Sequence, residues 1–323
     1  MPATVRELRA NLGPNVKFRE PLSGYTNFKI GGRAQFLLVA TATQEAARAV
    51  QVAGELKLPL LVLGGGSNVL VSDRGFPGLV VIMRASGWSI EATKVTAEAG
   101  VNLAFLVQKT ITAGLTGFEP LVAVPGTVGG AVYGNAGIPQ VAKGFIGDFV
   151  TEVTVCRGDT VVTVPRQQCA FGYRDSAFKH ASDVILQAAF ELAPGNAAES
   201  HKLVKCYLEA RKSQPYHQPS SGCIFTNVPI TDADEVRRKF AGEEKLEQFI
   251  SRGQLPASWL IDRAGLKGKT IGAVQVSPNH ANYLVNLGGG KAAEVVQMIS
   301  YIKQRVRDQF GIQLQEEVRY LGF

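Results

Sequence analysis

The sequence has no apolar run long enough to cross a lipid bilayer. Its longest apolar runs, 36–40 and 58–63, are far shorter than the ~20 residues that a membrane-spanning helix needs. The first residues carry charges at helical spacing, without the apolar stretch and small-residue cleavage site of a secretory signal. We therefore expect a cytoplasmic protein with no membrane partner.

Closely spaced cysteines are also absent. The four cysteines, Cys156, Cys169, Cys206 and Cys223, lie far apart and form no CxxC pair, and the four histidines are equally dispersed. Structural zinc and iron–sulfur sites need clustered ligands, so we expect no bound metal. In a cytosolic protein the cysteines are expected to be reduced thiols.

Charged residues are few, at 19%, and their balance is basic, with a net charge of +7. The basic residues are scattered, and the densest groups, 237–239 and 303–307, have acidic residues nearby. No basic stripe with interleaved aromatic residues is present, which argues against a nucleic-acid partner. The charge favours a small anionic ligand instead, such as one that carries phosphate groups.

The pattern of apolar residues predicts a mixed α+β fold. A strand at 36–40, a helix at 44–56 capped by Thr43, and a strand at 60–63 form a β-α-β unit. The remaining expected elements are a helix at 103–113 capped by Asn102, a hairpin of 149–155 with 160–164, a strand at 184–192, helices at 200–213, 256–264 and 291–310, and a strand at 317–321. With 323 residues, two or three domains are expected, and the polar stretch 193–200 is the clearest boundary.

Glycine is abundant, with 35 residues where average usage gives about 23. The first cluster, Gly64, Gly65 and Gly66, follows a predicted strand and continues into Ser67 and Asn68. It is not a Rossmann fingerprint, because Val69 stands at the third glycine position and a strand, not a helix, follows. Successive bare N–H groups can bind an anion, although a tight turn between strands remains the alternative.

The second glycine cluster begins at Pro125. Its residues of interest are Pro125, Gly126, Thr127, Val128, Gly129, Gly130 and Asn135. Pro125 sets a turn, after which a short helix can open with its N–H groups facing a pyrophosphate. Sharp bends between sheets would also use such glycines. Two phosphate-competent loops without a Rossmann fold favour one flavin nucleotide held by both.

Eight segments in order identify a family. They are NFKIGGRA at 27–34, LGGGSNVL at 63–70, PGTVGGA at 125–131 with NAG at 135–137, YRDSAFK at 173–179, SGCIFTN at 221–227, LIDRAGLKG at 260–268, HAN at 280–282 and EVR at 317–319. With these segments the chain resembles the UDP-N-acetylenolpyruvoylglucosamine reductase family nearly end to end. The short interval between Tyr173 and Cys223 favours the subgroup without an extra tyrosine loop.

The resemblance implies a fold, cofactors and a substrate. It implies an FAD-binding region of the vanillyl-alcohol-oxidase type in two subdomains, 1–80 and 81–197, and a C-terminal α+β substrate-binding domain at 198–323, with the chain returning to the FAD region near its end. FAD is expected at the two glycine loops and NADPH as reductant. The UDP-sugar substrate carries an enolpyruvyl double bond, which is reduced to give UDP-N-acetylmuramate for peptidoglycan. We expect a monomer.

The reaction needs a hydride carrier, groups that stabilise an enolate, and a proton donor. Only the flavin can carry hydride, since no side chain can. By resemblance, Arg174 and Glu317 stabilise the enolate, Arg174 because a guanidinium grips a carboxylate through two hydrogen bonds. From the residue alone, a surface or structural salt bridge would be the favoured role of Arg174, and only the resemblance reverses that preference. The neighbouring Glu316 would point the opposite way if 317–321 is a strand.

Cys223 stands where the commonest family pattern has a serine. An unperturbed thiol has a pKa of about 8.5, so near neutrality it is mostly protonated and far more acidic than a hydroxyl. Cys223 is therefore expected to be the proton donor. The alternative is that Cys223 is a small buried apolar residue, as most cysteines are. The other three cysteines are expected to be structural.

Further contacts are implied only by the resemblance. Residues expected to bind the substrate are Tyr173, Asn227, Lys267 and His280. After Gly137 the family usually continues Ala-Tyr-Gly, whereas this chain has Ile138, Pro139 and Gln140, so the contact of that tyrosine cannot be transferred.

Two other functions remain open from the sequence. Another FAD-dependent oxidoreductase of the same superfamily would share the glycine loops but has no need for the segments around Cys223 and Glu317. A non-catalytic nucleotide-binding protein would share the loops and lack the flavin.

Overall fold

The computed structural model describes residues 3–139, 141–215 and 217–323, so Gln140 lies outside the described residues. The chain divides into two compact units, each built from several segments. The first comprises 1–21, 33–66 and 76–212, and the second comprises 22–32, 67–75 and 213–323. The three domain ranges expected from the sequence stay a prediction.

The first unit contains two sheets. One has the order β1 (Lys17–Pro21), β2 (Arg33–Ala40), β5 (Phe76–Met83) and β3 (Leu60–Leu63). The other has the order β10 (Thr160–Pro165), β9 (Val150–Arg157), β11 (Val184–Glu191), β7 (Lys94–Glu98) and β6 (Trp88–Glu91), and a small pair joins β12 (Ala193–Pro194) to β8 (Leu115–Thr116). The predicted β-α-β unit is confirmed, because β2 and β3 both pair in parallel with β5.

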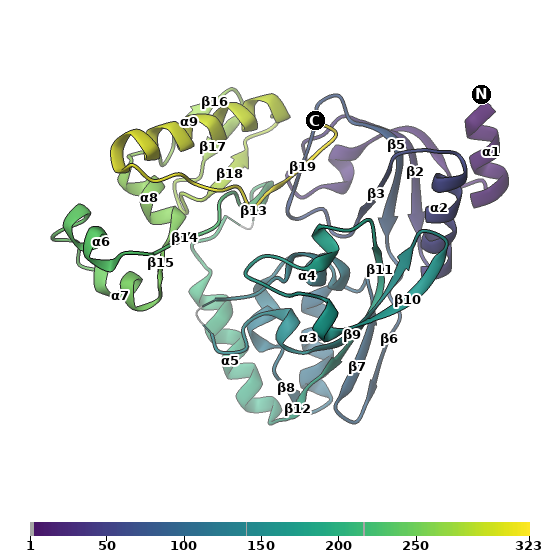
Figure 1. The fold of residues 1–323 in the computed structure, drawn as a ribbon, viewed down its shortest axis with the longest axis horizontal. Helices are drawn as coiled ribbons and strands as arrows, with labels where there is room; N and C mark the ends of the chain where they lie inside the picture. Colours follow the sequence, from purple (N-terminus) through teal and green to yellow (C-terminus); the bar gives the residue numbers. More distant parts are fainter. Residues whose placement is uncertain (1–2, 140, 216) are drawn as a thin grey trace. The chain divides into compact units, whose positions relative to one another are not determined.

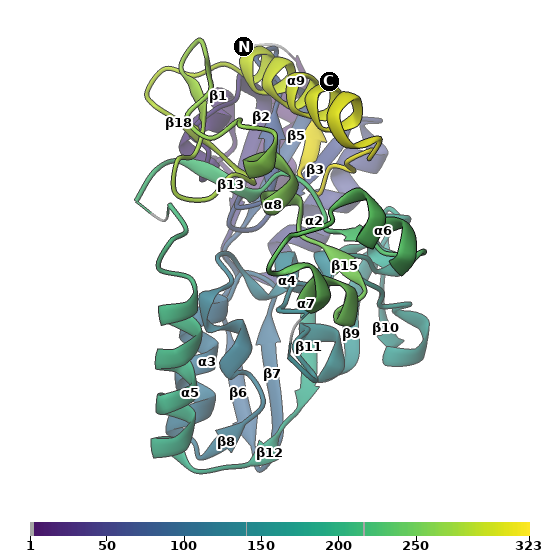
Figure 2. The same cartoon turned by 90° about the vertical axis from the view of Figure 1, so that its left-hand side faces the viewer.

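Five α-helices are described in the first unit (Figure 1). They are α1 (Ala3–Leu12), α2 (Thr43–Glu55), α3 (Leu103–Thr112), α4 (Val128–Gly134) and α5 (Ala197–Ala210). The α2 helix contacts β2, β5 and β11, and therefore both large sheets. The α3 and α5 helices pack against each other and against the 3-10 helix η2 (Glu119–Ala123), as Figure 2 shows for the two α-helices.

The helix starts differ slightly from those expected. Asn102 caps α3 as predicted, since its Oδ1 accepts from the N–H of Phe105. The predicted cap of α2 at Thr43 is wrong: the helix begins at Thr43 itself, and the Glu45 carboxylate accepts from the main-chain N–H groups of residues 41 and 42. The α5 helix begins three residues before its expected start because Asn196 caps it.

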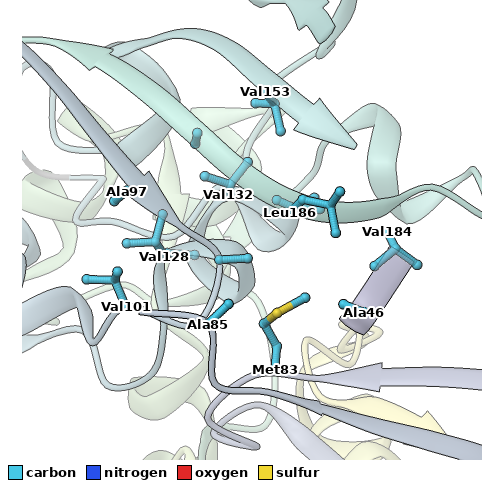
Figure 3. Close-up of a cluster of buried hydrophobic side chains, with 14 of the residues drawn as sticks. Ala46, Met83, Ala85, Ala97, Val101, Val128, Val132, Val153, Val184 and Leu186 are labelled. Carbon is cyan, nitrogen blue, oxygen red and sulfur yellow. The ribbon is translucent and has the colours of Figure 1, made fainter. Parts of the chain in front are cut away.

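The core of the first unit extends under the second glycine cluster. Val128 and Val132 of α4 point into a cluster that also contains Ala97, Val101 and Leu186 (Figure 3). Burying two valine side chains stabilises α4 by roughly 3–6 kcal/mol in transfer free energy. This packing fixes the loop that precedes α4.

The second unit is built around a four-stranded sheet. Its order is β13 (Ser220–Cys223), β18 (Tyr283–Asn286), β17 (Val274–Val276) and β16 (Thr270–Ile271), and two further pairs join β14 (Val228–Pro229) to β15 (Gln254–Leu255) and β4 (Val69–Val71) to β19 (Arg319–Leu321). Its helices are α6 (Ala233–Lys239), α7 (Leu246–Ser251), α8 (Ala257–Arg263) and α9 (Ala292–Phe310). The buried face of α9 belongs to a separate apolar core.

Two segments distant in sequence are bound into this unit. The Asp73 carboxylate accepts from the N–H groups of Ala292 and Ala293 at 2.8 and 3.0 Å. These two N–H groups lie in the first turn of α9 and have no acceptor within the helix. The last strand is shorter than expected: 317–321 was predicted, but β19 begins at Arg319, because the N–H of Glu317 is donated to the carbonyl of Ile224 at 2.7 Å.

Candidate active site

The two glycine clusters lie against each other in the first unit. A Cβ on Gly65 would lie 2.9 Å from the Cα of Gly126, and one on Gly64 would overlap the Thr127 hydroxyl. Such distances are shorter than any ordinary carbon contact, so side chains at these two positions would push the loops apart. The bare backbone is therefore what allows the two clusters to lie against each other and form one surface.

This surface presents main-chain N–H groups. In the part of the chain that the structure describes, the N–H groups of Gly64, Gly65, Gly66, Gly126 and Thr127 make no hydrogen bond to a main-chain carbonyl. Gly66 and Gly126 have φ values of +63° and +120°, which glycine adopts at little cost. Neighbouring N–H groups of this kind bind anions, so the surface, here called the glycine cradle (64–66 and 126–127), fits a pyrophosphate.

The start of α4 differs from expectation. Thr127 caps the helix, with its Oγ1 accepting from Gly130. The N–H groups of Val128 and Gly129, however, donate to the carbonyls of Val101 and Ala99, each at 2.9 Å. The prediction that the first N–H groups of this helix face a ligand is therefore wrong for these two residues.

Arg84 supports the glycine cradle and was not found by sequence reasoning. Its Nη1 donates to the carbonyls of Gly64 at 2.9 Å and Met83 at 3.1 Å. Arg84 follows β5, and nothing in the local sequence indicates that its partner is the loop after β3.

Asn135 ends α4 and uses its side-chain amide within the protein. Its φ is +41°, a left-handed conformation that asparagine tolerates at helix ends. Its Nδ2 donates to the carbonyl of Gly172 at 2.7 Å, and its Oδ1 accepts from the N–H of Gly147 at 3.0 Å. Asn135 thus ties the end of α4 to the loop that carries Tyr173 and Arg174.

Arg174 lies in a tight turn. Gly172 and Asp175 exchange two main-chain hydrogen bonds of 3.0 and 3.2 Å, which leaves Tyr173 and Arg174 at the tip. Arg174 has a φ of +56°, which costs a non-glycine residue ~1 kcal/mol or more. Lys179 donates to its carbonyl at 2.5 Å, so the surrounding residues hold this strained conformation.

The guanidinium of Arg174 has a defined place within the first unit. Its Nη1 donates to the carbonyl of Gly137 at 3.1 Å. Its Cζ lies 5.8 Å from the ring centre of Tyr173 and 6.0 Å from that of Phe145. Aromatic rings beside a guanidinium attract it and restrict its motion.

Asp175 closes the same turn. Burial raises the pKa of its carboxyl, but the hydrogen bond from His180 and a main-chain hydrogen bond outweigh burial, so the pKa is lower than the ordinary value. The His180 Nε2 lies 2.9 Å from its Oδ1. Asp175 is therefore ionised near neutrality and helps to hold the turn.

In the second unit the structure brings Cys223 and Glu317 together. Cys223 ends β13, directly after Gly222 with its φ of +79°, and is paired in register with Tyr283 of β18. The next residue, Ile224, accepts from the N–H of Glu317 at 2.7 Å. The two expected catalytic residues thus lie on backbone segments that are directly hydrogen-bonded to each other.

Asn282 holds the segment that follows Cys223 and was missed by sequence reasoning. Its side chain, only 4% exposed, accepts from the N–H of Phe225 at 2.9 Å and donates to the carbonyl of Phe225 at 2.8 Å. The Asn282 carbonyl also accepts from Ile224. The only signal in the sequence was its place beside His280 in a family segment, which did not indicate this role.

The expected substrate-binding residues of the second unit make contacts within the protein. Asn227 accepts from the N–H of Ala257 at 3.3 Å, and Lys267 pairs with Asp262 at 2.7 Å. His280 packs edge-on against Tyr283, with ring centres 4.9 Å apart. Their role in substrate binding stays a prediction.

Neither a metal centre nor a membrane span is found where the chain is described. No group of three or more His, Cys, Asp or Glu residues could hold a metal ion among those residues. Over the same residues, no helix combines the length and apolar character needed to cross a membrane. Cys156 and Cys169 are buried, and burial raises the pKa of Cys169 to about 11, as expected of a structural thiol.

Two family models match the chain. One describes an FAD binding domain and matches residues 34–164, and the other describes the C-terminal domain of UDP-N-acetylenolpyruvoylglucosamine reductase and matches residues 214–321. These matches confirm the expected fold class, an FAD-binding region of the vanillyl-alcohol-oxidase type followed by a substrate-binding domain.

Similar proteins extend over nearly the whole chain. The UDP-N-acetylenolpyruvoylglucosamine reductase of Rubrobacter xylanophilus is 35% identical over 316 residues, which cover 96% of this chain and 97% of that protein. The protein of that name from Solibacter usitatus is 39% identical, with coverages of 94% and 95%. The crystal structure of UDP-N-acetylenolpyruvylglucosamine reductase from Thermus caldophilus matches with a TM-score of 0.72 and 29% identity, covering 95% of this chain and 98% of that one.

Proposed function

Because the chain belongs to the UDP-N-acetylenolpyruvoylglucosamine reductase family, we propose that it reduces the enolpyruvyl group of UDP-N-acetylglucosamine enolpyruvate to give UDP-N-acetylmuramate. The reductant is NADPH, and the product serves peptidoglycan synthesis. The observation that carries the proposal is the near full-length similarity to reductases of this name, together with a glycine cradle suited to a pyrophosphate.

FAD is the cofactor of this reaction. When bound, it takes hydride from NADPH and supplies it to the enolpyruvyl double bond. The glycine cradle supports this assignment, because five N–H groups that donate to no main-chain carbonyl among the described residues suit the two phosphates of FAD. The proposed contacts are Gly64, Gly65, Gly66, Ser67, Pro125, Gly126, Thr127, Val128, Gly129, Gly130 and Asn135. Asn68, expected at the same place from the sequence, is left out of this set because its amide donates to the Glu317 carbonyl.

Three residues carry the proposed acid–base and electrostatic steps. Negative charge develops on the substrate carboxylate as its neighbouring carbon gains electrons. Arg174 and Glu317 stabilise this enolate through hydrogen bonds, Glu317 as a protonated or proton-sharing carboxyl, since an ionised carboxylate could not donate one. Cys223 then donates the proton of its thiol to that carbon and completes the addition across the double bond. The main-chain hydrogen bond between Ile224 and Glu317 supports a shared site for Cys223 and Glu317.

Substrate recognition is assigned to four polar side chains. Tyr173, Asn227, Lys267 and His280 are proposed to bind the UDP-sugar. Lys267 and His280 suit an anionic or hydroxyl-rich ligand by their hydrogen-bonding capacity. We further propose that the enzyme is a cytoplasmic monomer.

The proposal is tested by spectroscopy and turnover of the purified protein. The expected sample is yellow, with flavin absorbance, and oxidises NADPH only when UDP-N-acetylglucosamine enolpyruvate is added. A protein that stays colourless after refolding with FAD would favour a non-catalytic nucleotide-binding role. A yellow protein that oxidises NADPH equally well without the UDP-sugar would point to another flavin oxidoreductase.

A further inference from the structure

The backbone around Glu317 is hydrogen-bonded to the segment that follows Cys223. The N–H groups of Glu317 and Val318 lie 2.7 and 3.4 Å from the carbonyl of Ile224. In the same pair of segments, Thr226 donates its N–H to the carbonyl of Gln315 at 3.0 Å. These bonds set the register of the two segments and use the N–H of Glu317, whereas its carbonyl is bound by another residue.

Asn68 holds that backbone at the Glu317 carbonyl. Its Nδ2 donates to the main-chain carbonyl of Glu317 at 3.2 Å, and its own carbonyl accepts from the N–H of Arg319 at 3.1 Å. The parallel pairing of β4 with β19 begins one residue later, at Val69 and Arg319. Asn68 therefore binds the Glu317 backbone through its side chain and the Arg319 backbone through its own carbonyl.

Lys303 holds the residue that precedes Glu317. Its Nζ lies 3.0 and 2.9 Å from the two carboxylate oxygens of Glu316. The two side chains are only 26% and 24% exposed, so solvent screens this pair less than it would a surface pair. Lys303 lies on α9, where its neighbour Ile302 is buried in the apolar core, so the cation has a rigid base.

We propose that Asn68 and Lys303 are positioning residues for Glu317. The inference rests on the proposed function, in which the Glu317 carboxyl acts on the substrate. A carboxyl displaced by about 1 Å can lose roughly 100-fold in rate, so a backbone held on both flanks has a direct kinetic consequence. The positioning role of Asn68 differs from the FAD contact expected from the sequence, because the Asn68 amide donates to the Glu317 carbonyl.

The test is a pair of double-mutant cycles. Asn68→Ala and Lys303→Met are each made in the wild type and in a Glu317→Gln background. In each variant three quantities are measured: the rate at which UDP-N-acetylglucosamine enolpyruvate reoxidises the reduced enzyme, the rate of flavin reduction by NADPH, and the FAD dissociation constant of the apoprotein. The last two report on folding and cofactor binding independently of Glu317.

In the wild type, each change is expected to slow reoxidation about three- to tenfold, the size of one net hydrogen bond. In the Glu317→Gln background the further loss is expected to be less than about twofold, because the group being positioned is gone. Flavin reduction and FAD affinity should stay within about twofold in all variants. Exchanging the pair, as Lys303→Glu with Glu316→Lys, should recover part of the rate that Lys303→Glu alone loses.

Matched controls remove similar bonds elsewhere. Asn11→Ala removes an exposed amide that donates to the main-chain carbonyl of Glu7, and Lys239→Met removes an ion pair with Glu235; neither should change the rate. Equal losses with and without Glu317 would overturn the inference. The inference would also be overturned if Asn68→Ala bound FAD more weakly and its reoxidation rate recovered at saturating FAD. A wild-type enzyme that the UDP-sugar does not reoxidise would overturn the proposed function as well.

Discussion

Arg174 has a backbone conformation that only a well-supported site retains. Its positive φ is opposed by the side chain, and the conformation persists because the Gly172–Asp175 pair and Lys179 hold both ends of the turn. Strained residues of this kind concentrate at functional sites. The strain therefore supports the catalytic role that the family segment implies for Arg174, whereas the residue type alone favoured a salt bridge.

The role of Cys223 is tested by two substitutions. Cys223→Ala removes the proton donor and is expected to lower kcat by about 10²–10⁴-fold, the usual contribution of a general acid. Cys223→Ser keeps a proton donor of lower acidity and should retain substantial turnover. Flavin reduction by NADPH, measured by stopped-flow absorbance, should be unchanged in both. Normal reoxidation of Cys223→Ala by the substrate would rule out the proposed proton transfer.

Residues with distant partners were the hardest to find from the sequence. The two glycine clusters of the cradle could be predicted because each is a run of neighbouring residues without side chains, which is visible in the local sequence. The role of Asn282 was not, because its partner Phe225 lies 57 residues away and an Asn–backbone pair has no sequence signature. The same holds for the ion pair of Lys303 with Glu316 across a helix end.

The contact between the two glycine loops gives a prediction for cofactor binding. Gly65→Ala places a methyl group 2.9 Å from the Gly126 backbone, and relieving such overpacking typically costs 1–3 kcal/mol. The loops should separate, and FAD affinity measured by fluorescence titration of the apoprotein should fall about tenfold or more. Gly54→Ala in α2, where a Cβ has open space, is the control and should leave the affinity unchanged. Unaltered affinity in Gly65→Ala would show that the cradle does not hold the cofactor.

The α5 helix is anchored on η2 by a buried carboxylate. Glu119, 3% exposed, accepts from Ser200 Oγ at 2.5 Å, Thr116 Oγ1 at 2.7 Å and the N–H of Gly117 at 2.7 Å. Burial raises the pKa of Glu119, but these hydrogen bonds outweigh burial, and the pKa is lower than the ordinary value. Glu119 is thus a structural anion in the first unit, and its donors are all hydroxyl or N–H groups.

A stability prediction follows from the sign of that shift. Because the pKa of Glu119 is lower in the folded state, its contribution is complete above the unfolded value of about 4.3 and is lost as the pH falls through the folded pKa. Glu119→Gln should lower the free energy of unfolding by about 2 kcal/mol at neutral pH and flatten its decline in acid, measured by urea denaturation. Glu91→Gln, at an exposed carboxylate on β6, should do neither. Equal acid sensitivity of Glu119→Gln and wild type would contradict this account.

Element boundaries were predictable where a local cap decides them. The Asn102 cap of α3 was predicted correctly from the sequence, since capping depends on adjacent residues. The short strand β19 was overestimated, because alternation along 317–321 does not reveal that Ile224 takes the first N–H group. Competition from another segment was the physical reason for the error.

At the scale of the whole molecule, neither of the two units is one continuous stretch of the chain. Residues 22–32 and 67–75 belong to the second unit although they lie far before its main part. Short inserted segments like these carry no compositional change, so the sequence could not assign them. Their inclusion explains how residues directly after the glycine cradle come to contact the Glu317 backbone.

The basic net charge also has a meaning at this scale. All three expected ligands, FAD, NADPH and the UDP-sugar, are anions, and a net charge of +7 favours their association at low ionic strength. Raising the salt concentration should therefore raise KM for the UDP-sugar more than it changes kcat, measured by steady-state kinetics. A KM that does not depend on salt would show that the excess charge does not contribute to substrate capture.

The central claim is that this chain reduces an enolpyruvyl UDP-sugar by way of bound FAD. The most direct measurement is an anaerobic single turnover, in which NADPH-reduced enzyme is mixed with UDP-N-acetylglucosamine enolpyruvate while flavin absorbance and the UDP-sugar product are followed together. The account predicts that the oxidised flavin spectrum returns as UDP-N-acetylmuramate forms in equal amount. A flavin that stays reduced in the presence of the UDP-sugar, or reoxidises without that product, would contradict it.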